Sequence, residues 1–377
     1  MASNATSAKV TAVTWRRGHV EVRQERRISE RLEAAGDLLV LTSSWERRCI
    51  EVSRVKHGRY FAAAVVTFAE EGASGRRAKH DAELARLAAD HAGIVTDLGR
   101  YSVSDVESWR NALAEFVAAT RITLGRPLDV VVDVSCLPKY YMLTLMGYCV
   151  SSGSVRSLRL LYAEGRYAPS DGNTSLAPDH AFTEGTWRSL PVPYLEGRLS
   201  PDKKVEIVAS IGFETFQARK LIRAYEAERH RLVTPYPGFS PEYGDQSEKE
   251  AKALATNLDL DEREILRCPA GDAAAAAEIV VDVLDHGGRF KEIGLCLGTK
   301  PHAIGFGVAA LIRPDFTLVC RMPDRYVETE TPAIGITWSY EVRDLSVVAS
   351  LNHGNSDAVG SNAARVDVGR LGPSVVT

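Results

Sequence analysis

A Gly-Thr-Lys turn is the segment of this sequence best suited to bind an anion. Gly298, Thr299 and Lys300 follow the apolar run 293–297 and precede an apolar stretch that opens with Pro301. At the start of a helix, such a turn offers free backbone N–H groups, a hydroxyl and an ammonium, which is the composition that a phosphate needs. The alternative is that Gly, Thr and Pro only cap the helix and that Lys300 is solvated.

Hydroxyl, aromatic and charged residues follow the other apolar runs. Because ligands bind at the carboxyl ends of the strands in an open parallel sheet, we expect ligand-binding residues among them. Trp45 and Phe213 could stack on a base, although an aromatic residue one step beyond a strand is more often part of the core. Glu46 and Glu214 also fit a simpler role, in which they complement a helix dipole. Beside the Gly-Thr-Lys turn, the expected ligand-binding residues are Ser43, Ser44, Trp45, Glu46, Ser135, Cys136, Lys139, Arg166, Tyr167, Ser210, Gly212, Phe213, Glu214, Arg325 and Tyr326.

The two halves of the sequence share a pattern of strands and turns. Trp45-Glu46 and Phe213-Glu214 are 168 residues apart, and Pro138 and Pro301 are 163 apart. The Arg-Tyr pairs at 166–167 and 325–326 are 159 apart, and the Thr-Trp pairs at 186–187 and 337–338 are 151 apart. Four matches in the same order predict a tandem duplication.

The matched turns differ in one respect that bears on binding. When Pro138 and Pro301 are aligned, Leu137 stands where the second half has Lys300. Lys139 then falls within the expected helix rather than at its start. We therefore expect unequal sites, with Lys300 the more important lysine.

Each half reads as strands that alternate with helices of ten or more residues, which requires parallel pairing through crossovers. The predicted fold class is α/β, with two tandem Rossmann-like, parallel-sheet domains related by internal duplication. Strands are expected at 37–41, 60–68, 128–134, 160–167, 205–209, 230–234, 293–297 and 319–326. Helices are expected at 28–35, 78–91, 103–120, 247–257 and 273–286, and also after Glu46, after Glu214 as far as Tyr225, and at the turns that contain Pro138 and Pro301. The expected divisions are an N-terminal extension (1–36), the first domain (37–170), a linker with an extra strand near Trp187 (171–204), the second domain (205–345) and a mobile tail (346–377).

The run from Gly294 to Pro301, Gly-Leu-Cys-Leu-Gly-Thr-Lys-Pro, resembles the Gly-Thr-Lys signature of CARF domains. The paired arrangement resembles SAVED domains, which combine two CARF-like units. The resemblance implies a Rossmann-like sensor of cyclic oligonucleotides in bacterial anti-phage defence. Leu297 departs from the pattern, because such signatures often have a further glycine there. No nuclease, protease or other effector segment is recognisable, so the resemblance implies a separate effector protein as partner.

Composition excludes several classes. The chain has 377 residues, 45% hydrophobic and 25% charged, with a net charge of -3, which is ordinary for a globular protein and argues against binding duplex nucleic acid. The sequence contains no apolar run long enough for a membrane helix and no secretory signal, so we expect a cytoplasmic protein without a membrane partner. Six scattered cysteines predict buried, reduced thiols rather than a metal site, and no cofactor is predicted.

Three functions remain open. The favoured hypothesis is a non-enzymatic sensor that binds a nucleotide between the two halves. The second is a nucleotide phosphodiesterase or ring nuclease, in which Lys300 stabilises the developing phosphorane charge and Ser135, Thr299 or Tyr326 orients the attacking group. The third is an interaction subunit whose clefts no longer bind a ligand.

Overall fold

The computed structural model describes nine stretches of the chain, and the statements below concern these residues alone. They are residues 11–17, 19–27, 32–68, 75–166, 183–197, 202–212, 215–286, 290–326 and 333–345.

The first sheet has eight strands in the order β1-β2-β16-β9-β8-β4-β6-β7. Its five strands from β9 to β7 are parallel, whereas β16 pairs antiparallel with both β9 and β2, and β1 and β2 form an antiparallel hairpin. The strands are β1 Thr11–Arg17, β2 Val20–Arg27, β4 Leu38–Ser43, β6 Tyr60–Phe68, β7 Ala92–Tyr101, β8 Leu128–Asp133, β9 Val155–Arg166 and β16 Ala333–Arg343.

The second sheet has six strands in the order β10-β15-β14-β11-β12-β13. Only β10 runs antiparallel, along β15. The strands are β10 Thr183–Pro191, β11 Lys204–Ser210, β12 Arg229–Pro235, β13 Ile265–Cys268, β14 Phe290–Cys296 and β15 Thr317–Tyr326. Two short strands, β3 Glu33–Ala34 and β5 Lys56–His57, pair separately.

The parallel parts of the two sheets have the same topology. Numbered along the chain within each half, the five parallel strands lie in the order 5-4-1-2-3 in both sheets. The strand that follows the fifth is exchanged between the halves, since β10 follows β9 in sequence but pairs with β15, and β16 follows β15 but pairs with β9. Each sheet is therefore completed by a strand from the other half.

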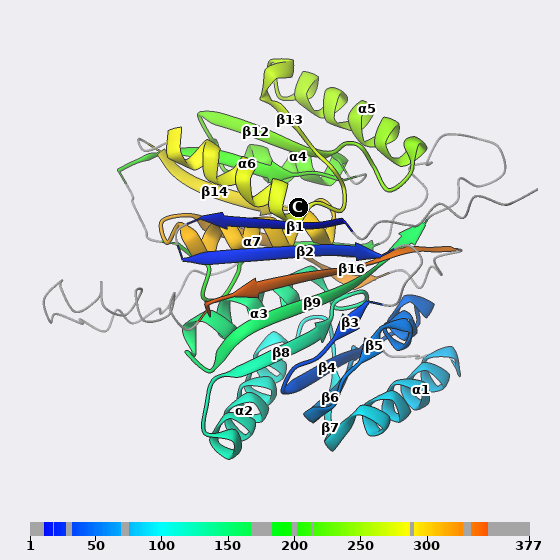
Figure 1. The fold of residues 1–377 in the computed structure, drawn as a ribbon. Helices are drawn as coiled ribbons and strands as arrows, with labels where there is room; N and C mark the ends of the chain where they lie inside the picture. Colours follow the sequence, from blue (N-terminus) through cyan, green and yellow to red (C-terminus); the bar gives the residue numbers. More distant parts are fainter. Residues whose placement is uncertain are drawn as a thin grey trace, which may run out of the picture.

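Helices cover the outer face of each sheet and fill the space between the sheets (Figure 1). The helices are α1 Gly75–His91, α2 Val106–Leu124, α3 Lys139–Ser151, α4 Thr215–Ala224, α5 Pro241–Asn257, α6 Ala273–His286 and α7 Lys300–Ile312, with the 3-10 helices η1 Arg47–Arg54 and η3 Glu262–Glu264. One apolar core includes α2, α3, α6 and α7 and reaches both sheets. Helices α3 and α7 approach closely, because a Cβ on Gly307 would lie 2.8 Å from Met146 Cε.

The N-terminal hairpin ties the first sheet to the second half. Buried Gln24, on β2, accepts hydrogen bonds from the backbone N–H groups of Ala273 and Ala274 at the start of α6. This side chain supplies the acceptor that the first turn of a helix lacks. On β1, Arg17 forms ion pairs with Asp282 and Asp285 of the same helix.

The α/β class and the extra strand near Trp187 are confirmed, but several predicted details are wrong. The sheets are mixed rather than wholly parallel, and they do not follow the expected division at 37–170 and 205–345, because β10 and β16 are exchanged. The third strand of each half, β7 and β13, was not predicted. The segment after Glu46 is a 3-10 helix, and residues 33–34 form a strand instead of part of a helix. The tail and residues 28–31 lie outside the described residues.

The predicted correspondence between the halves also needs a correction. Leu158, Leu160 and Tyr162 of β9 face the central core, as do Leu318, Cys320 and Met322 of β15, which are 160 residues later. The sequence match at 159 residues would therefore place matched side chains on opposite faces, because a shift of one residue reverses the face of a strand. The internal duplication itself remains a prediction.

Candidate functional site

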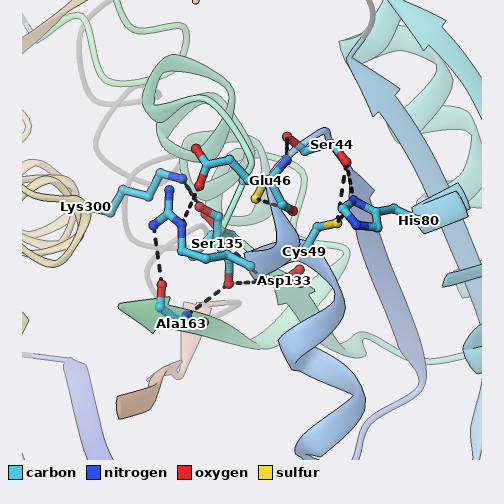
Figure 2. A network of polar contacts seen from close by, with 11 residues as sticks. Ser44, Glu46, Cys49, His80, Asp133, Ser135, Ala163 and Lys300 are labelled. Carbon is cyan, nitrogen blue, oxygen red and sulfur yellow. Dashed lines mark hydrogen bonds and ion pairs between the residues drawn. The ribbon is translucent and has the colours of Figure 1, made fainter. Parts of the chain in front are cut away.

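Two lysines join the halves through a reciprocal set of hydrogen bonds, which we call the lysine clasp. Lys139 Nζ, at the first residue of α3, donates to the carbonyls of Leu297 (3.0 Å) and Gly298 (2.8 Å) in the second half. Lys300 Nζ, at the first residue of α7, donates to the carbonyls of residues 134 (2.8 Å) and 135 in the first half. Figure 2 shows Lys300 reaching the Ser135 turn.

The clasp overturns the expectation that the two lysines differ in position. Lys139 is the first residue of α3, directly after the N-cap residue Pro138, and Lys300 is the first residue of α7, directly after the N-cap residue Thr299. The two lysines therefore occupy the same position at the start of their helices. Leu137, which was aligned with Lys300, is buried. The helix start, and not the proline, marks the equivalent position.

A cavity of about 230 Å³ lies beside the clasp, at the carboxyl ends of strands from both sheets. Four cationic side chains line it, Arg48, Lys139, Lys300 and Arg321, and no carboxylate of the described residues does. Five aromatic rings also line it, those of Tyr162, Trp187, Phe239, Tyr243 and Tyr326. The combination of cations and flat apolar surfaces suits a ligand with an anionic group and a ring.

The aromatic residues form two groups around the cavity. The guanidinium of Arg321, on β15, lies 4.2 Å from the centre of the Trp187 ring on the neighbouring strand β10. Phe239 lies 6.3 Å from Tyr162 and 5.8 Å from Tyr243, measured between ring centres. Rings from both halves therefore meet at this cavity.

Electrostatics at the clasp depend on burial. Burial, together with the nearby charge of Arg48, lowers the pKa of Lys300 from 10.5 to about 8. Asp133, at the end of β8, is fully buried, and burial raises its pKa from 3.8 to about 6 in spite of hydrogen bonds from Ser135. Lys300 is still mainly protonated at neutral pH, so it can bind an anion there.

The Ser135 side chain has a structural role. Its hydroxyl donates to Asp133 Oδ1 (2.6 Å) and accepts the backbone N–H of Ala163 (2.9 Å), which ties the turn after β8 to β9. A hydroxyl can donate one hydrogen bond, and here Asp133 accepts it. This arrangement gives no support to Ser135 as a group that orients an attacking nucleophile.

Thr299 and Ser210 also hold the turn in place. The Thr299 hydroxyl donates to the Ala270 carbonyl (3.0 Å) and accepts the His302 N–H (3.3 Å), so Thr299 caps α7 as the simpler alternative expected. Ser210 Oγ accepts the Gly298 N–H at 3.1 Å. A Cβ at Gly298 would lie 2.2 Å from this oxygen, which explains the glycine.

The turn after β4 belongs to the same polar network as the Ser135 turn (Figure 2), because Arg48 donates to the carbonyl of Ala163 and the N–H of Ala163 donates to Ser135. Ser43 donates to Asp81, and His80 Nδ1 donates to the Ser44 carbonyl at 2.8 Å. Glu46 accepts from Arg48 Nε at 2.5 Å, so its carboxylate partly neutralises a cation of the cavity.

Other predicted residues have varied placements. Gly212 and Tyr326 line the cavity, whereas Trp45 and Cys136 are partly buried beside it without being among the lining residues. Arg166 is the last residue of β9 and Arg325 is the second-last residue of β15, but their side chains lie outside the described part of the structure. Tyr167, Phe213 and Glu214 also lie outside it.

Sequence reasoning missed ten residues of the cavity wall, and six of these have aromatic or cationic side chains. Two of the six carried a usable signal, since Arg48 follows the Trp45-Glu46 turn and Trp187 belongs to the matched Thr-Trp pairs. The other four come from the strands β9 and β15, from the loop before α5 and from the first turn of α5, where no turn pattern marks them. The six are Arg48, Tyr162, Trp187, Phe239, Tyr243 and Arg321.

Among the described residues, no group of three or more His, Cys, Asp or Glu side chains is arranged to hold a metal ion. The cysteines are free thiols, five of them buried, as predicted. No helix in the described ranges is long and apolar enough to cross a membrane.

Comparison with known proteins leaves the family open. No protein-family model matches the chain, and no curated protein matches it in sequence. The cytoplasmic domain of a prokaryotic cation chloride cotransporter is similar over 76% of this chain and 95% of that chain, with 7% identity and a TM-score of 0.24. UDP-GlcNAc 2-epimerase from Neisseria meningitidis is similar over 70% of this chain and 77% of that chain, with 10% identity and a TM-score of 0.21. The protein is thus described by its own fold and site, as an α/β protein with a cavity between two sheets that is lined by cationic and aromatic side chains.

Proposed function

We propose that this protein is a sensor that binds a nucleotide or cyclic oligonucleotide in the cavity beside the lysine clasp, and that it signals to a separate effector protein in bacterial defence. The observation that carries the proposal is the cavity wall, with four cations, five aromatic rings and no carboxylate among the described residues. Phosphates bind to such cations, and bases stack on such rings.

The position of the cavity supports the same proposal. It lies at the carboxyl ends of parallel strands, where open α/β sheets bind their ligands. Both halves contribute residues, as expected for two Rossmann-like units that arose by duplication, and the shared strand order supports that origin. Its volume is slightly below the roughly 300–1,000 Å³ of typical small-molecule sites, so we expect it to admit one nucleotide-sized group.

The enzyme alternative has less support. Ser135, Thr299 and Tyr326 are the hydroxyls expected to orient an attacking group. Ser135 and Thr299 each already donate their proton to a protein acceptor, so of the three only Tyr326, which lines the cavity, keeps this role open. A binding site needs no such group. We therefore keep sensing as the proposed function.

Titration calorimetry and thermal unfolding with linear and cyclic nucleotides test the proposal. Arg321→Met removes a cation of the cavity wall, and we expect it to weaken binding about 10- to 100-fold, as for a lost charge-assisted hydrogen bond. The matched control is Arg188→Met, an exposed position on β10 that does not line the cavity. If no nucleotide binds the wild-type protein, or if both variants lose affinity equally, the proposal is wrong.

A further inference from the structure

We infer that the cavity binds a single asymmetric nucleotide, with its phosphate at the lysine clasp and its one base at Trp187 and Arg321, rather than a cyclic dinucleotide with two-fold symmetry. The inference rests on the proposed function and narrows its ligand class. It follows from a difference between comparable positions in the two exchanged strands.

The exchanged strands provide the comparison. Each pairs antiparallel with the last parallel strand of the other half, and each has a bulge of the same kind, between Glu184 and Trp187 in β10 and between Ile334 and Thr337 in β16. The first paired residue after the bulge is Trp187 in one strand and Thr337 in the other. These two residues therefore occupy comparable positions, and Trp338 is one residue further along.

The shift of one residue explains why the two tryptophans differ. Successive side chains of a strand point to opposite faces. Trp187 is half-buried and lines the cavity. Trp338 is only 7% exposed, and its indole N–H donates to Glu164 at 2.6 Å. A Cβ at Gly271 would lie 2.4 Å from the Trp338 ring, so this ring is packed against the backbone and cannot swing out to a ligand without disrupting that contact.

The cation stacked on the indole has no counterpart at the comparable position of the other half. Trp187 pairs with Pro323, and Arg321, two residues before Pro323, covers the Trp187 ring at 4.2 Å. In the other half Thr337 pairs with Ala163, so the position comparable to Arg321 is Leu161. Leu161 is 1% exposed and packs in the core with residues of η1. One half thus offers an indole and a guanidinium, whereas the other offers a threonine and a buried leucine.

The clasp, in contrast, serves both halves alike. Each lysine ammonium has three N–H groups, and two of them bind carbonyls of the opposite half. Both lysines line the same cavity, so the third N–H of each is the one that can meet an anion there. A single phosphate can therefore receive a hydrogen bond from each half, while the indole with a guanidinium stacked on it is found on one side of the cavity.

A symmetric ligand would meet a mismatch. A cyclic dinucleotide presents two equivalent bases, and the second base would face the half that lacks the indole and the guanidinium. Because the two sides of the cavity offer different surfaces, a ligand with one base near the clasp is favoured over one with two equivalent bases. Linear mononucleotides have that form.

The experiment is a calorimetric comparison of AMP, GMP, CMP and UMP with cyclic di-AMP and cyclic di-GMP on the full chain. We expect a linear mononucleotide to bind with a stoichiometry of one and at least tenfold more tightly than either cyclic dinucleotide. Trp187→Leu should weaken that binding by about 5- to 150-fold, the range for loss of one base–aromatic stack. Trp187→Phe should restore most of the affinity, because a ring remains.

Trp338→Phe is the matched control, since it keeps an aromatic ring at the buried position while it removes the indole N–H and part of the ring volume. It should leave the affinity within twofold of the wild-type value. Tighter binding of a cyclic dinucleotide, or unchanged mononucleotide affinity in Trp187→Leu, would overturn the inference and leave the proposed function standing. Absence of binding by every nucleotide would instead overturn the proposed function, and with it the inference.

Discussion

The lysine clasp makes a sharp prediction about stability. Lys139→Met keeps the length and most of the volume of the side chain but removes both hydrogen bonds to the carbonyls of Leu297 and Gly298. Hydrogen bonds to a charged group contribute about 1.5–3 kcal/mol each, so the two together contribute at least about 3 kcal/mol before compensation. The substitution also removes two unfavourable contributions to folding, the desolvation of the half-buried ammonium and the lost conformational entropy of a long side chain, which together amount to about 1–2 kcal/mol. We therefore expect a net loss of about 2 kcal/mol in the free energy of unfolding.

Thermal unfolding followed by calorimetry measures this loss. For a chain of this length, unfolding entropy of about 2 cal/mol/K per residue converts 2 kcal/mol into a decrease of about 2–3 °C in Tm. Lys252→Met is the control, because Lys252 is exposed and forms only a surface ion pair with Glu248, so its loss should change the free energy of unfolding by less than about 0.5 kcal/mol. Equal Tm values for Lys139→Met and Lys252→Met would show that the clasp does not stabilise the contact between the halves.

Three further predictions concern neighbouring groups. The pKa of Lys300 falls from 10.5 to about 8 on folding, so between these two pH values the unfolded chain binds more protons than the folded chain. The free energy of unfolding should therefore rise with pH across that window, and this rise should be absent in Lys300→Met. Burial raises the pKa of Glu292, which lies beside buried Glu206 in the strand register, so the stability that depends on the protonated carboxyl group is lost as the pH rises. Glu292→Gln should therefore be more stable than the wild type by about 1 kcal/mol at pH 7 and equally stable at pH 4, as measured by urea titrations. Gly298→Ala places a Cβ 2.2 Å from Ser210 Oγ and should cost about 1–3 kcal/mol, so a Tm equal to that of the wild type would contradict the close approach.

Much of the framework could be predicted from the sequence, because apolar runs followed by turn residues carry their own signal. The runs at 37–41 and 293–297 became buried central strands, β4 and β14, each with neighbours on both sides. Buried parallel strands are apolar on both faces, so they stand out in a sequence. The Gly-Thr-Lys turn was equally visible, and the structure places it at the cavity.

The strands at the sheet edges could not be predicted in the same way. β7 lies at the edge of its sheet and exposes Ile94 and Val95, so its sequence shows neither a continuous apolar run nor a clean alternation. β13, at the edge of the other sheet, has only four residues. The missed cavity residues illustrate a second limit, since the partnership of Trp187 and Arg321 depends on a strand exchange that only long-range pairing reveals.

The exchange and the close packing together hold the walls of the cavity in place. Helices α3 and α7 meet so closely that a Cβ on Gly307 would displace the end of the Met146 side chain, 2.8 Å away. Separating the halves would open this apolar contact and also break both sides of the clasp, and packed interfaces resist such partial opening because they lose contacts at once. The clasp lysines are held by carbonyls in the positions where they would receive a phosphate. A ligand then adds a partner to each ammonium without replacing one, which reduces the ordering cost of binding.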